Sequence, residues 1–105
     1  MRMYTTKPVK ELTAIEYKDI LKDKDIIISP HALWHLSMKQ RKVFNEEELL
    51  NTLNRENPRK AYLQENGRYA AYYRKKDGFR KIIIEVNGKI IIVSFMDMLE
   101  LPKLT

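Results

Sequence analysis

The chain has 105 residues, 44% hydrophobic and 32% charged, a balance that is typical of one folded domain and excludes wholesale disorder. Its formal net charge of +6 favours polyanionic partners such as RNA, DNA or an acidic protein. The absence of cysteine excludes disulfides and thiolate chemistry, and no apolar run approaches the ~20 residues that a membrane-spanning helix needs.

Residues 1–10 are expected to form a short flexible tail or an edge segment, because Pro8 argues against a central strand. They lack the apolar core and cleavage site of a secretory signal, and together with the missing cysteines this favours a cytoplasmic location. Thr13 and Glu16 have the spacing of a capping box. The spacing predicts a first helix from about Ala14 to Lys22.

The apolar run at 26–28 consists of three isoleucines, and it is either a brief strand or a bridge between helices. Ser29 and Pro30 predict the start of a second helix, because serine caps well and proline at the first helical position loses no hydrogen bond. This helix is expected to run to about Gln40, with Trp34 on its buried side.

Asn45 and Glu48 have the spacing of another capping box, which predicts a third helix from Glu46 to about Arg55. Three glutamates in its first turn suit the positive end of the helix dipole. Pro58 closes this helical half, which spans residues 11–57.

All three glycines follow an asparagine or aspartate, a pairing typical of type I′ hairpin turns. The pairs are Asn66-Gly67, Asp77-Gly78 and Asn87-Gly88. Strand-like segments surround them at 61–65, 68–74, 79–86 and 89–96. The sequence therefore predicts a single α+β domain over 1–105, with about three N-terminal helices packed on a four-stranded antiparallel β-meander at 59–97.

Alternation along these strands sorts their side chains into two faces. The predicted core face carries Tyr69, Ala71, Tyr73, Ile82, Ile84, Val86, Ile91, Val93 and Phe95. The opposite face carries Arg68, Tyr72, Arg74, Lys81 and Ser94, a mixture that suits either RNA contacts or a solvated surface. It also carries Ile83, Ile90 and Ile92, which is more apolar than a solvated face should be, so something is expected to cover it.

The two histidines, His31 and His35, lie four residues apart on the predicted second helix. Histidines at this spacing can share a metal ion, but the intervening residues supply no glutamate of the zincin type. We therefore favour packed or surface histidines and predict no metal site and no cofactor. Near the helix start, a neutral His31 could act as a general base or as a second cap.

The segment from His31 to Arg41, followed by Phe44 and the glutamates at 46–48, resembles small prokaryotic domains related to BrnT-type toxins. These domains are distant members of the RelE-like ribonuclease toxin superfamily. The resemblance covers roughly residues 26–97, and the predicted first helix is an addition to that pattern.

The resemblance implies RNA cleavage, with or without ribosomes, and inhibition by an acidic antitoxin-like protein. His31 and Arg41 match the family pattern directly. Arg68, Arg74 and Lys81 are analogous to its basic sheet residues in kind. In such a site His31 would act as base or acid, and the four basic residues would bind phosphate without a metal.

Two other hypotheses remain open at this point. The same basic sheet would suit a non-catalytic module that binds nucleic acid. A structural or protein-interaction domain, forming a homodimer through an exposed strand edge or an isoleucine patch, is the alternative from a different class.

Overall fold

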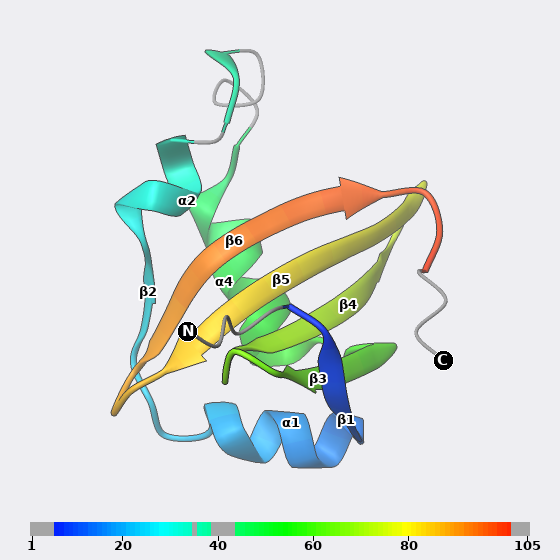
Figure 1. Cartoon of the computed structure of the whole chain (residues 1–105). Helices are drawn as coiled ribbons and strands as arrows, with labels where there is room; N and C mark the ends of the chain where they lie inside the picture. Colours follow the sequence, from blue (N-terminus) through cyan, green and yellow to red (C-terminus); the bar gives the residue numbers. More distant parts are fainter. Residues whose placement is uncertain (1–5, 35, 39–43, 102–105) are drawn as a thin grey trace, which may run out of the picture.

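A computed structural model of the protein contains one mixed sheet of six strands, in the order β1-β3-β4-β5-β6-β2 (Figure 1). The structure describes residues 6–34, 36–38 and 44–101. The strands are β1 (Pro8–Leu12), β2 (Ile26–Ile28), β3 (Lys60–Gln64), β4 (Tyr69–Lys75), β5 (Gly78–Val86) and β6 (Ile90–Met98). The helices with described bounds are α1 (Ala14–Leu21), α2 (Pro30–Trp34) and α4 (Glu46–Arg55).

The predicted fold class, three helices followed by a four-stranded meander, is wrong. The meander itself exists, because β3, β4, β5 and β6 pair consecutively and antiparallel. Two further strands from the N-terminal half extend it on both sides. β1 pairs antiparallel with β3, and β2 pairs parallel with β6. Helices and strands are therefore interleaved along the first half of the chain.

The hairpin turns also differ from the predicted type I′ geometry. That turn needs two consecutive residues with positive φ. In the described part of the chain, glycine alone has positive φ in the three turns, and Asp23 is the one other residue with this conformation. In the first hairpin, the Gly67 N–H donates to the Gln64 carbonyl and closes the turn, and Gly67 itself has a φ of 86°.

The helix starts follow the predicted capping. The Thr13 hydroxyl accepts from the Glu16 N–H, and the Glu16 carboxylate accepts from the Thr13 N–H in return. The Asn45 side chain accepts from the N–H of Glu48. The Ser29 hydroxyl accepts from the His31 N–H at the start of α2. That helix is shorter than predicted: α2 ends at Trp34, and Leu36 and Ser37, which the structure also describes, are not helical, so the predicted continuation to about Gln40 is wrong.

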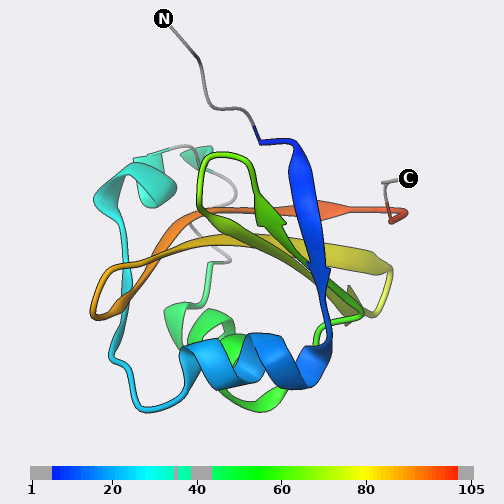
Figure 2. The ribbon, with the colours of Figure 1, turned by 60° about the horizontal axis from the view of Figure 1, so that its bottom comes forward.

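α1 and α4 lie together on one face of the sheet and form the main core with it (Figure 2). α1 contributes Tyr17 and Leu21, and α4 contributes Leu49 and Leu53. Trp34, which was expected to be buried, is 72% exposed. Among the described helices, none is long and apolar enough to cross a membrane.

A β-bulge in β6 changes which side chains face this core. Ile83 pairs with Ser94 whereas Ile84 pairs with Ile92, so Val93 is left over as the extra residue. Ile90 and Ile92 are consequently fully buried. The core positions predicted at 91 and 93 are therefore wrong, while the other seven predicted core-face residues pack in the core.

Candidate nucleic-acid interface

We call the side of the sheet opposite α1 and α4 the second face; it is turned toward the viewer in Figure 1. Its centre is apolar and closed, since Tyr62, Ala70 and Tyr72 are buried there. Ile83, Met98 and Leu101 pack against them. The centre of the second face is therefore not an open stacking platform, and two pockets lie on this face.

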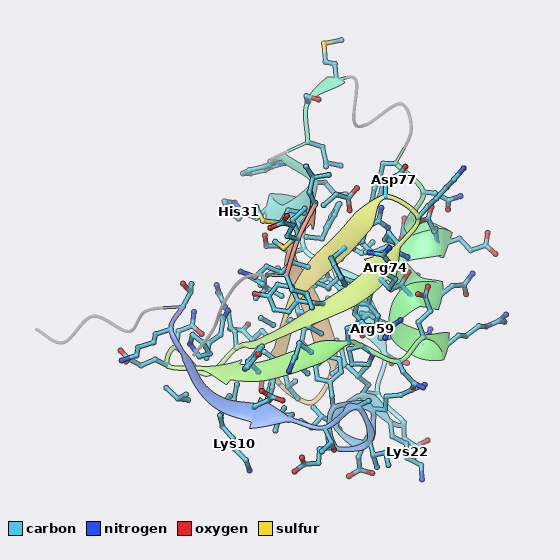
Figure 3. All side chains as sticks on the ribbon, turned by 90° about the vertical axis from the view of Figure 1, so that its right-hand side faces the viewer. Lys10, Lys22, His31, Arg59, Arg74 and Asp77 are labelled. Carbon is cyan, nitrogen blue, oxygen red and sulfur yellow. The ribbon has the colours of Figure 1, made fainter. Side chains whose placement is uncertain are left out.

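The first pocket, which we call the His31 pocket, has a volume of about 240 Å³. It is lined by Thr6, His31, Gln64, Asn66, Arg68, Ile83, Val93 and Ser94. His31 comes from α2, Arg68 follows the hairpin turn between β3 and β4, and Ser94 lies on β6. Figure 3 shows His31 on the side of the strands opposite α4. The fold thus brings together two site residues that the sequence placed in different halves of the chain.

Local hydrogen bonds position the two residues. Ser29 fixes the start of α2 on the sheet, because its N–H donates to the Ile92 carbonyl while its hydroxyl accepts from the His31 N–H. The His31 ring makes an edge contact with Trp34 at 6.2 Å between centroids. The Arg68 N–H donates to the Asn66 side chain, which holds the residue at the mouth of the hairpin.

The Arg68 guanidinium is half-exposed and paired loosely with one carboxylate. Its Nε lies 3.7 Å from a carboxylate oxygen of Glu85, and both side chains remain more than 40% exposed. Exposed pairs of this kind contribute little to stability. The guanidinium can therefore exchange this partner for a phosphate at small cost.

The second pocket, which we call the Tyr72 pocket, has a volume of about 280 Å³. It is lined by Thr6, Lys7, Pro8, Tyr62, Gln64, Ala70, Tyr72, Lys81 and Met98. The Lys81 ammonium lies 5.6 Å from the centre of the Tyr72 ring, a cation–π arrangement. Burial lowers the pKa of Lys81, and no carboxylate in the described part of the chain pairs with it.

Gln64 belongs to both pockets. The residue is 3% exposed, and its Oε1 atom is buried without a hydrogen-bond partner among the described residues. Sequence reasoning missed this residue. The available signal was its position two residues after Tyr62 on the same strand, which puts it on the second face beside Arg68.

The remaining predicted site residues lie elsewhere. Arg74 is on the second face, but its guanidinium stacks 5.1 Å from the Phe79 ring, well away from His31 in Figure 3. Lys81 lines the neighbouring pocket and not that of His31. Arg41 and His35 lie outside the described residues. Of the four predicted site residues that the structure describes, His31 and Arg68 are the two that share a pocket.

In the described segments, no three acidic or histidine side chains are grouped closely enough to hold a metal ion. No protein-family model matches the chain, and no curated protein or solved structure matches it either. The resemblance to BrnT-type toxins stays a prediction.

Proposed function

We propose that the protein is a metal-independent endoribonuclease of the RelE/BrnT type, which binds RNA at the second face and cuts it in the His31 pocket. One observation carries the proposal: an imidazole and a guanidinium, with the Ser94 hydroxyl, line the same small pocket. The net charge of +6 supports a polyanionic substrate.

In the proposed reaction the ribose 2′-hydroxyl attacks the adjacent phosphorus, and the bond from phosphorus to the 5′ oxygen breaks. The His31 imidazole accepts the 2′ proton, and solvent protonates the departing 5′ oxygen. Arg68 stabilises the negative charge that grows on the phosphate oxygens. The products are a 2′,3′-cyclic phosphate and a 5′-hydroxyl end.

The test is RNA cleavage by purified protein, with and without ribosomes, in the presence of EDTA. His31→Ala is expected to lower the rate by about 100-fold or more, because general acid–base groups contribute on that order. Arg68→Ala is expected to lower it strongly as well. Arg74→Ala is the matched control, since it removes the same charge from the same face away from the pocket, and it should retain most activity.

Two results would overturn the proposal. One is a folded protein that cuts no RNA under any of these conditions. The other is cutting that survives His31→Ala unchanged, since the proposed proton acceptor would then be absent without consequence.

We further propose a cytoplasmic location, which the lack of cysteine supports, and an acidic inhibitor protein as the partner. The alternative function, a non-catalytic homodimer, is favoured by the exposed apolar side chains of Trp34, Met38 and Met96. Analytical ultracentrifugation over a range of concentrations separates the two. If the protein is a nuclease, we expect it to bind RNA or an acidic protein. If the alternative holds, we expect a stable dimer that does not bind RNA.

A further inference from the structure

The Tyr72 pocket has the features of a small-ligand site that the cleavage chemistry does not use. Its apolar lining comes mainly from Tyr62, Tyr72 and Met98. Its polar lining comes from Thr6, Lys7, Gln64 and Lys81. Ligand pockets are typically apolar with a few polar groups that fix orientation. Its volume of about 280 Å³ suits a single planar ring system.

Gln64 supplies the observation that points to a ligand. A buried acceptor without a partner is costly to stability, and native proteins rarely retain one without a reason. The terminal amide of glutamine turns easily, because its last torsion is broad. Rotation about this torsion would turn Oε1 toward the pocket that Gln64 lines, where a ligand N–H would satisfy it.

Lys81 adds the preference for an anion. Its ammonium is partly desolvated against the Tyr72 ring and has no carboxylate partner among the described residues. A phosphate next to the pocket would provide that partner.

We propose that the Tyr72 pocket is a nucleobase subsite, in which a base packs against Tyr72 and Met98 and donates an N–H to Gln64 Oε1 while Lys81 holds its phosphate. The inference rests on the proposed function, because Gln64 also lines the His31 pocket and would hold the nucleotide next to the one that is cut. Each RNA base carries a ring or exocyclic N–H that can reach such an acceptor.

The test titrates the full chain with the four ribonucleoside 5′-monophosphates and with ribose 5-phosphate, which lacks the base, followed by amide NMR shifts. At least one nucleotide is expected to bind about tenfold more tightly than ribose 5-phosphate, the ratio that one buried hydrogen bond provides. Gln64→Met should remove this preference. It should leave the free energy of unfolding unchanged or higher, because it replaces an unsatisfied polar group with an apolar one of similar shape.

Two further variants keep the result interpretable. Ala70→Leu fills the pocket without removing a polar group, and it should abolish the preference for nucleotides as well. Lys81→Met should weaken the binding of nucleotides and of ribose 5-phosphate alike. Lys76 is an exposed lysine in the turn before β5, and Lys76→Met should change the binding of neither.

The proposal is overturned if nucleotides bind no better than ribose 5-phosphate, or if Gln64→Met and Ala70→Leu both keep the preference. A base preference in a protein that cuts no RNA would support the subsite and contradict the proposed nuclease function. RNA cleavage without any base preference would contradict the subsite and support the proposed nuclease function.

Discussion

Gly78 begins β5 with a φ of 155°, and a Cβ added there would collide with the carbonyl oxygen of Met98. That oxygen is main-chain and cannot swing aside, so β5 and β6 would have to separate. Gly78→Ala is expected to lower the free energy of unfolding by about 3 kcal/mol, the upper range for forced overpacking. Urea denaturation monitored by circular dichroism measures the loss.

Gly88→Ala is the matched control for this substitution. Gly88 has a φ of 70° but open space where its Cβ would stand. It should lose about 1 kcal/mol from backbone strain alone. Equal losses of unfolding free energy in the two variants would show that the collision with the Met98 carbonyl oxygen adds no cost beyond backbone strain.

Single residues of the site were predictable from the sequence to different degrees. His31 and Arg68 could be named because their side-chain chemistry and the hairpin signals around Arg68 are visible in the sequence. Gln64 could not, because its significance lies in an unsatisfied buried oxygen, which exists only after the strands have packed. Arg74 was chosen for its charge, and its stacking on Phe79 depends on strand register.

At the scale of elements, α1 is attached to the sheet through two buried tyrosines. Burial raises the pKa of Tyr17 and of Tyr73, and their hydroxyls lie next to each other without a well-formed hydrogen bond. Both groups are therefore neutral in the folded protein at pH values where an unfolded tyrosine, with a pKa near 10, already ionises.

This attachment predicts loss of stability in alkali. Below about pH 10 the stability contributed by the raised pKa values is fully present, and it is lost as pH rises further because the unfolded chain releases protons first. Each tyrosine contributes a slope of about 1.4 kcal/mol per pH unit in that range. Urea denaturation between pH 8 and about 11 measures it.

Tyr17→Phe should reduce this slope, while Tyr69→Phe, at a partly exposed tyrosine, serves as the control. An unchanged slope in Tyr17→Phe would mean that α1 leaves the sheet before the tyrosine ionises.

The sequence predicted the meander well and the sheet edges poorly. Hairpins are local, so turn residues and alternation locate β3 to β6 within a few residues. β1 and β2 pair with strands far along the chain, and nothing in Pro8–Leu12 or Ile26–Ile28 specifies those partners. The bulge at Val93 has no sequence signal either, and it alone reverses the faces of Ile90 and Ile92.

At the scale of the whole molecule, the fold separates two surfaces that the sequence mixes. α1 and α4 cover one face of the sheet, and the second face retains Arg68 and Lys81 at its two pockets. If both side chains bind phosphate, RNA affinity must fall as the salt concentration rises. In a plot of the logarithm of the binding constant against the logarithm of the salt concentration, each phosphate contact contributes about 0.7 to the steepness of the slope.

Arg68→Met and Lys81→Met are each expected to lower that slope by about 0.7, measured by fluorescence anisotropy of a labelled single-stranded RNA at increasing salt. Lys76→Met removes the same charge at a lysine that lines neither pocket, and it should lower the slope much less. Equal effects of all three substitutions would indicate attraction by net charge and no defined contacts.

The most direct measurement maps an RNA that cannot be cut, carrying 2′-O-methyl groups, on the wild-type protein by amide NMR shifts. We expect shifts on the second face, around Gln64, Arg68 and Ser94, with α1 and α4 unaffected. Shifts confined to α1 and α4, or none at saturating RNA, would contradict the claim that this face of the sheet binds RNA.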